Sequence, residues 1–418
     1  MLNTTSITLP RKLTTTQKAA RGVIFQSLQK MEMGCLTIIE SFHTETKERS
    51  ERFTAPNGEY SGQPVVATIE VKHPDFYSRI LQGGSIAAGE AYMDGWWDSP
   101  DLTALMKLMA LNMRALDKLE EQGSWLTKLL YKFSHWTNRN SQENSRKNIH
   151  AHYDLGNDLY EAFLDTNMLY SSALYHTSVD SLEQAQINKM ERLCQQLDLQ
   201  STDHVIEIGT GWGAMAIYMA EQYGCRVTTT TISEEQHEYA RQQIVQRGLA
   251  DRITLLKEDY RNLTGTYDKL VSIEMIEAVG KQFLASYIKK CESLLKPSGL
   301  MAIQAITIAD QRYDYYSNNV DFIQKYIFPG GFLPSVTSLT QATTKHSDLV
   351  VRDLFDIGLD YAKTLNEWHR RFNRAEDAVR GFGYDDRFVR MWRYYLSYCE
   401  GGFLARTISA VHMTFQRP

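Results

Sequence analysis

The sequence has few cysteines and no long hydrophobic run. None of its apolar stretches reaches the roughly 20 residues that a membrane-spanning helix needs, and the polar start MLNTTSITLPRKLTTTQ has no signal-peptide core. We therefore expect a soluble, cytoplasmic protein. The five cysteines are odd in number and widely spaced, with no C-x-x-C pair, so the sequence indicates neither a disulfide framework nor a zinc site.

The charge of the chain also excludes a class of function. A formal net charge of −5 argues against a general nucleic-acid binder, because phosphate neutralisation needs a basic surface. Two segments are nevertheless basic and amphipathic: residues 11–30, around Phe25, and residues 124–140, around Lys128, Lys132 and Trp136. Such helices can lie in an anionic bilayer surface, although packing on their own domain is the favoured interpretation of either segment alone.

The length and the local patterns predict two domains. Residues 1–124 combine strand-like CLTIIE and VVATIEV with a helix in PDFYSRILQ and a turn-rich stretch at 83–97. The polar, basic residues 125–149 form the predicted linker. In residues 150–418, helical and strand patterns alternate, which predicts an α/β fold with a parallel sheet whose ligands bind at the carboxyl ends of the strands.

A glycine-rich turn follows one of these strands. In VIEIGTGWGAM the spacing is E-x-G-x-G-x-G, formed by Glu207, Gly209, Gly211 and Gly213. Positions without side chains let the backbone approach a nucleotide closely. A dinucleotide fold would show G-x-G-x-x-G and an acid on the next strand, which here ends in TTTTISEEQ. The spacing therefore favours S-adenosylmethionine over a nicotinamide cofactor.

Several further segments carry a family resemblance in sequence order: HYDLGNDLYEAFLD, MLYSSALY, IEIGTGWGAMAIYMA, TISEEQ, EDYRNL, SIEMIEAVG, YIFPGGFLPS and YYLSYCEGGFLAR. Together they resemble the cyclopropane-fatty-acyl-phospholipid synthase family over nearly the whole chain. The resemblance implies a class I methyltransferase domain, Rossmann-like with a mostly parallel seven-stranded sheet, at residues 150–418. It also implies a smaller α+β lipid-binding or accessory domain at residues 1–124.

The resemblance implies a reaction as well. S-adenosylmethionine would supply a methylene unit to the double bond of an unsaturated acyl chain in membrane phospholipid, giving a cyclopropane chain through a carbocation. The protein would work at the inner face of the membrane, and a homodimer is left open. A methyl- or methylene-branching fatty acyl methyltransferase is the main alternative. A small-molecule N-methyltransferase and a non-catalytic lipid-binding protein are less favoured.

The cofactor residues that the resemblance implies fall at predicted strand ends. Tyr170 and Ser171 would close over the cofactor, and Ile273 would lie beside its methionine end. The remaining positions would form the glycine turn or flank the ribose and the adenine: Glu207, Gly209, Gly211, Gly213, Thr231, Ile232, Gln236, Asp259, Tyr260 and Arg261.

Two acids interrupt the apolar stretch SIEMIEAVG. A carbocation next to a spent sulfonium needs negative charge nearby and a base to remove a proton, and a buried carboxylate is costly unless it is paired or used. The resemblance places Glu277 as a ligand of a bound bicarbonate that acts as the base. Glu274 occupies a variable family position, and we expect it to be structural.

The other catalytic candidates also come from the resemblance. Tyr361 matches a ligand of the bound base, and Cys399 matches a cysteine near the acyl pocket. Ser172 and Gln304 stand where family members commonly have cysteine and histidine, but both can still donate hydrogen bonds to an anion. The segment HYDLGND, with His152 and Asp154, is expected to order a lid over the cofactor.

Overall fold

The computed structural model describes residues 13–42, 49–113 and 155–418, which form two compact units. The first unit contains the described residues up to 113 together with Tyr384–Ala405; the second contains those from 155 to Gly383 and Arg406–Pro418. Within these ranges no helix combines the length and the apolarity needed to cross a bilayer. The predicted linker at 125–149, including Lys128, Lys132 and Trp136, lies outside the described residues.

The N-terminal unit is an α+β domain, as the sequence predicts. Its main sheet has the order β2-β1-β5-β6, in which β1 and β5 are parallel and the other pairs are antiparallel. The elements of this unit are α1 (Thr15–Leu28), β1 (Cys35–Glu40), β2 (Arg49–Thr54), β3 (Glu59–Tyr60), β4 (Gln63–Pro64), β5 (Val66–Val71), α2 (Phe76–Met93), β6 (Trp97–Asp98), α3 (Leu102–Leu111) and α17 (Asp386–Leu404).

The structure decides between packing and membrane docking for helix α1. The Phe25 ring is buried, with its centroid 5.0 Å from that of Phe53 and 5.9 Å from that of Tyr77. Arg21, from the same helix, donates to the buried carboxylate of Glu40 over 2.6 Å. The apolar side of α1 therefore serves the core of its own unit, and the hypothesis that Phe25 meets a membrane is wrong.

Helix α2 corrects a second expectation. The stretch at 83–97 is not turn-rich, because α2 continues to Met93 with a kink at Gly84, whose φ is 60° and ψ is −145°. Ile86 and Tyr92 beyond the kink are buried. The glycines misled the prediction: one of them supplies the kink, while burial of the flanking apolar residues stabilises the helix on both sides.

Helix α17 comes from the end of the chain but belongs to the N-terminal unit, where it packs on α3 and α2. A Cβ on Gly401 would lie 2.6 Å from the backbone nitrogen of Lys107, so only glycine permits this approach. Thr103 donates to Glu400 over 3.0 Å, and Arg390 pairs with Asp98 at 3.2 Å. The prediction placed the residues of α17 in the domain of 150–418, whereas the helix belongs to the N-terminal unit.

The second unit is built on a seven-stranded sheet of order β12-β13-β11-β10-β7-β8-β9. The strands from β11 to β9 are parallel neighbours, and β13 is antiparallel to both β11 and β12. Its strands are β7 (His204–Ile208), β8 (Arg226–Thr230), β9 (Ile253–Leu256), β10 (Tyr267–Ile273), β11 (Leu295–Ile308), β12 (Val350–Asp356) and β13 (Ile408–Gln416). This confirms the predicted fold class.

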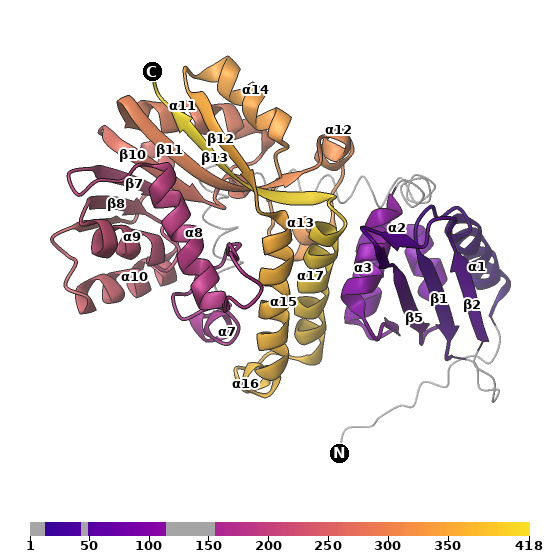
Figure 1. The fold of residues 1–418 in the computed structure, drawn as a ribbon. Helices are drawn as coiled ribbons and strands as arrows, with labels where there is room; N and C mark the ends of the chain where they lie inside the picture. Colours follow the sequence, from indigo (N-terminus) through magenta and orange to yellow (C-terminus); the bar gives the residue numbers. More distant parts are fainter. Residues whose placement is uncertain (1–12, 43–48, 114–154) are drawn as a thin grey trace. The chain divides into compact units, whose positions relative to one another are not determined.

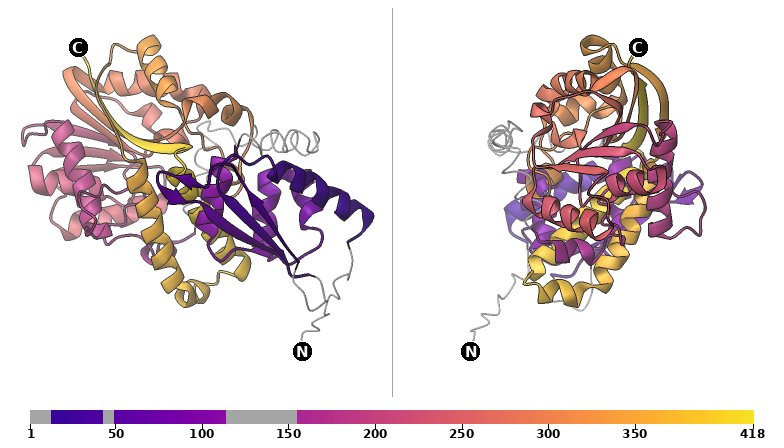
Figure 2. Two further views of the ribbon diagram at one scale, coloured as in Figure 1. Left: turned by 45° about the vertical axis from the view of Figure 1, so that its right-hand side comes forward. Right: turned by 90° about the vertical axis from the view of Figure 1, so that its left-hand side faces the viewer.

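Helices cover both faces of this sheet (Figures 1 and 2). Ile206 packs toward α11 and α14, whereas its neighbour Val205 packs toward α8, α9 and α10, as the alternation of side chains along a strand requires. The helices are α7 (Asn157–Glu161), α8 (Leu182–Gln196), α9 (Ala214–Tyr218), α10 (Glu234–Gln246), α11 (Leu284–Leu294), α12 (Asp310–Asn318), α13 (Phe322–Tyr326), α14 (Val336–His346), α15 (Gly358–Arg374) and α16 (Glu376–Gly381).

Candidate active site

The glycine turn joins β7 to α9 with left-handed backbone at each glycine. The φ angles of Gly209, Gly211 and Gly213 are 100°, 54° and 100°. A Cβ on Gly213 would lie 3.1 Å from that of Ala240, so this glycine lets α10 pack closely. A Cβ on Gly211 would meet no described atom within 4 Å. Gly211 thus combines a backbone conformation that favours glycine with open space, which suits a ligand.

Glu207 lies beneath this turn. Thr229 donates to its carboxylate over 2.5 Å, and Thr229 also lies 2.6 Å from the hydroxyl of Thr210 in the turn itself. Burial raises the pKa of Glu207 to about 8. The side chain therefore ties the turn to the end of β8, and its predicted contact with a cofactor stays a prediction.

The other predicted cofactor residues gather at neighbouring strand ends. After β8, the Thr231 hydroxyl donates to the Gln236 side chain over 2.9 Å, and Ile232 is partly exposed beside them. After β9, Arg261 and the buried Asp259 form an ion pair at 2.7 Å. Two further predicted cofactor residues also lie at strand ends. Tyr260 begins the 3₁₀ turn that follows β9, and Ile273 is the last residue of β10.

Tyr170 lies in an aromatic cluster that the sequence did not reveal. Its ring centroid is 5.2 Å from that of Tyr160 and 5.3 Å from that of Trp368. Trp212, inside the glycine turn, has its ring centroid 5.0 Å from that of Tyr160 and donates to Asn157 over 2.8 Å. The tryptophan in GTGWG is a sequence feature that could have indicated that this turn packs against neighbouring aromatic rings.

Glu274, which we expected to be structural, lies at the centre of the predicted catalytic residues. It follows β10 with φ of 47°, a rare backbone conformation for a residue other than glycine. The Ser172 backbone N–H and the Gln304 side chain donate to its Oε1 over 2.9 and 2.7 Å. The Tyr361 hydroxyl donates to its Oε2 over 2.7 Å. Three residues predicted to hold a bound base therefore hold the Glu274 carboxylate: Ser172, Gln304 and Tyr361.

Strand register explains how Gln304 reaches this carboxylate. Ile273 on β10 pairs with Gln304 on β11, and Gln304 in turn pairs with His412 on β13. His412 Nε2 lies 2.9 Å from Gln304 Oε1, which turns the Gln304 amide nitrogen toward Glu274. Burial lowers the pKa of His412 to about 3, so its ring is neutral. Sequence reasoning missed His412 because it did not place β13 beside β11.

Glu277 is one 3₁₀ turn beyond Glu274. Its Oε1 accepts the Ile306 backbone N–H over 2.5 Å, while its Oε2 is buried without a hydrogen-bond partner in the described part of the chain. Burial, and after it the negative charge of Glu274, raise the pKa of Glu277 to about 8. At neutral pH Glu277 therefore carries a proton.

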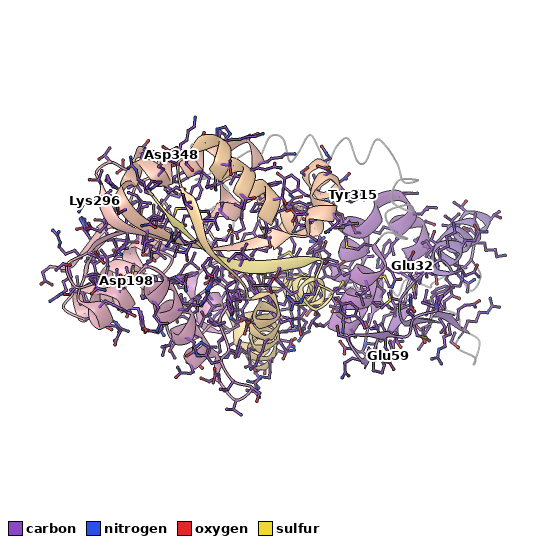
Figure 3. All side chains as sticks on the ribbon, turned by 45° about the horizontal axis from the view of Figure 1, so that its top comes forward. Glu32, Glu59, Asp198, Lys296, Tyr315 and Asp348 are labelled. Atoms are coloured by element: carbon purple, nitrogen blue, oxygen red, sulfur yellow. The ribbon has the colours of Figure 1, made fainter. Side chains whose placement is uncertain are left out.

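A buried lysine acts on the charge of Glu274. Lys189, on α8, is fully buried and donates to the Ser171 hydroxyl over 2.6 Å. Burial lowers its pKa to about 8, against the opposing effect of Glu274. Elsewhere on this unit charged side chains such as Asp198, Lys296 and Asp348 are exposed (Figure 3). Lys189 is thus a buried positive charge that acts on Glu274.

Three predicted residues are not among those that the described part of the second unit brings to this site. Cys399 lies on α17, which belongs to the N-terminal unit. His152 and Asp154 lie outside the residues that the structure describes. The roles predicted for these three residues stay predictions.

Comparison with known proteins agrees with this architecture. The mycolic acid cyclopropane synthetase family matches residues 140–413. The chain is 39% identical to the cyclopropane-fatty-acyl-phospholipid synthase of Escherichia coli (strain K12), over 84% of this chain and 88% of the relative. It is 37% identical to the tuberculostearic acid methyltransferase UfaA1 of Mycobacterium tuberculosis, over 85% of each. Among solved structures, the cyclopropane synthase MmaA2 from Mycobacterium tuberculosis aligns with a TM-score of 0.61 at 24% identity, covering 65% of this chain and 98% of that one.

The raised pKa of Glu277 predicts how pH acts on stability. A carboxyl whose pKa is higher in the folded protein than in the unfolded chain costs stability as pH rises from the unfolded value toward about 8. Glu277→Gln removes this cost, so its advantage in unfolding free energy over wild type should grow by up to about 1.4 kcal/mol per pH unit between pH ~5 and ~8. Denaturant unfolding at several pH values measures it, and a difference independent of pH would refute the assignment.

Proposed function

The chain belongs to the mycolic acid cyclopropane synthetase family, and on that basis we propose that it forms cyclopropane rings on unsaturated acyl chains of membrane phospholipid. It is an S-adenosylmethionine-dependent methyltransferase that modifies lipid. The observation that carries the finer proposal is the hydrogen-bonded Glu274 carboxylate, with Glu277 beside it, at the end of β10 in the same unit as the glycine turn.

The residues present suit S-adenosylmethionine. Gly211 leaves open space beside the turn, and Thr231, Gln236 and Asp259 are buried polar groups at the ends of β8 and β9. When bound, the cofactor supplies an electrophilic methyl group on a positively charged sulfur. A sheet that presents polar groups at adjacent strand ends is where such folds bind nucleotide-like ligands.

The carboxylates fit an alkene substrate better than an amine. In the proposed reaction the double bond takes the methyl group through its π electrons, the carbon–sulfur bond breaks with its electron pair on sulfur, and a carbocation remains on the chain. Fixed negative charge from Glu274 stabilises that cation, and the aromatic faces of Tyr170 and Tyr361 lie in the same unit. An amine substrate keeps its charge on nitrogen and needs no proton removed from the methyl group. The two acids therefore argue against a small-molecule N-methyltransferase.

A methyl-branched product is the second candidate. It is favoured by the similarity to a tuberculostearic acid methyltransferase. Glu274 follows directly after β10, so its position along the acyl chain is fixed by the strand. Loss of a proton from the new methyl group closes a ring, whereas loss from a neighbouring chain carbon leaves a branched alkene. The side of the chain that faces the base decides between them.

Gly211→Val should abolish binding of S-adenosylmethionine, because a β-branched side chain would fill the space beside the turn. Gly248→Val is the matched control: Gly248 also has a positive φ, 68°, with open space around it, but it follows α10 away from the turn. Titration calorimetry on both folded variants measures the affinity. Undiminished affinity in Gly211→Val, or equal loss in both variants, would count against the cofactor site.

Methyl-deuterated S-adenosylmethionine with unsaturated phospholipid distinguishes the two products. Ring closure should lose one deuterium and leave a CD₂ unit with no double bond, as measured by mass spectrometry of the acyl chains. A product that retains all three deuteriums would reject the cyclopropane and support the branched alkene. Cofactor binding without any lipid product would instead support a non-catalytic lipid-binding protein.

We also propose that the protein works at the membrane surface, since an acyl double bond lies inside the bilayer. The basic segment at 124–140 is the candidate contact, and each well-placed basic residue should contribute about 1 kcal/mol with anionic lipid. Lys128→Glu with Lys132→Glu should weaken sedimentation with anionic vesicles. Lys289→Glu with Lys345→Glu, exposed on α11 and α14, is the control of equal charge change. Equal sedimentation of both double variants would remove this segment as the contact.

A further inference from the structure

The residues assigned to a bound bicarbonate do not fit that anion in this chain. The Ser172 N–H, the Gln304 amide and the Tyr361 hydroxyl all donate to the Glu274 carboxylate. The Ser172 hydroxyl donates to the Ala173 carbonyl, and Gln304 Oε1 is engaged by His412. A second anion would have to displace Glu274 from these donors and would then lie between two acids.

The chemistry of the donor set is nevertheless that of a carboxylate site. Three donors from the loop before α8, from β11 and from α15 converge on one planar group with two oxygens. Glu274 supplies such a group itself, and bicarbonate would present the same O–C–O unit. The left-handed backbone at Glu274 is what turns its side chain back into the site, a strain of the kind found at functional positions.

Glu274 is the better-stabilised carboxylate of the pair, because it accepts hydrogen bonds from three donors. Burial raises its pKa, while the hydrogen bonds from Ser172, Tyr361 and Gln304 and the charge of Lys189 act in the opposite direction. Glu277 receives one backbone N–H and has a buried oxygen with no described partner, so it is the better holder of the shared proton. Since its three donors favour the charged form, Glu274 is the member of the pair suited to accept a proton.

We propose that Glu274 is the base that completes the reaction, in place of a bound bicarbonate. This inference rests on the proposed alkene methylation. In the ring-closing case Glu274 Oε2 takes a proton from the new methyl group, and the released C–H electron pair forms the third bond of the ring with the cationic carbon. Glu274 becomes neutral and returns the proton to solvent before the next turnover. The sum is one alkene and one S-adenosylmethionine giving one cyclopropane, one S-adenosylhomocysteine and one proton.

The first test is the dependence of wild type on bicarbonate. Turnover of unsaturated phospholipid in carbon dioxide-depleted buffer should be unchanged by added bicarbonate, followed both as S-adenosylhomocysteine released and as lipid product. A rate that rises with bicarbonate would overturn the proposal. Carbon-13 NMR of labelled bicarbonate should likewise show no binding to wild type, and specific binding there would also overturn it.

The second test restores the base from outside. Glycine tolerates φ of 47°, so Glu274→Gly should fold, bind S-adenosylmethionine and lose turnover by at least ~100-fold, the usual range for removing a general base. Added formate or bicarbonate should recover activity and bind in the vacated space. Glu274→Gln is the matched control, because its amide fills that space and should block recovery. A Glu274→Gly variant that keeps wild-type turnover, or that no anion restores, would refute Glu274 as the base.

The two hypotheses fail in different ways. If wild type modifies no unsaturated phospholipid, the proposed function is wrong. The NMR comparison still applies in that case, because it requires no turnover. Bicarbonate that binds Glu274→Gly but not wild type would then show that Glu274 occupies an anion site of another reaction, and would remove its assignment as base for alkene methylation.

Discussion

The site depends on one interaction, the capture of the Glu274 carboxylate by donors from three separate elements. The Ser172 N–H, the Gln304 amide and the Tyr361 hydroxyl come from a loop, a central strand and a helix. Each donor is in place only when its strand, helix or loop is in place. The three hydrogen bonds therefore form only when the loop before α8, β11 and α15 are assembled around the end of β10. It also sets the electrostatics, because its charge helps to keep the proton on Glu277.

The fold was largely predictable because its signals are local. Alternating helix and strand patterns, together with the glycine turn, predicted the parallel part of the sheet, and the family resemblance predicted seven strands. Predictions failed where tertiary contacts override local signals. Gly83 and Gly84 look like a turn, yet they lie within α2. Helix α17 is near the end of the chain but packs in the first unit, which no local pattern could indicate.

The site was predictable in composition but not in arrangement. The resemblance named Ser172, Gln304 and Tyr361 as a set, and in the structure they converge on one carboxylate, that of Glu274. It gave Glu274 no part in that set, since a position that varies within a family carries no role to transfer. The three hydrogen bonds to its carboxylate show that Glu274 belongs to this set, and the left-handed backbone after β10 is a feature that the sequence does not reveal.

A glutamate side chain differs from a bound anion in what controls its position. A small anion adjusts to its donors, whereas the reach of Glu274 is fixed by the end of β10 and by the hydroxyl of Tyr361 on α15. Oε2 is the oxygen that Tyr361 orients, so in the proposed reaction the placement of α15 would select which proton of the cation is within reach. Under the proposed role of Glu274 as base, product choice would therefore depend on helix packing as much as on the acid itself, and residues that hold α15 in place, such as the buried Trp368, would be part of the same constraint.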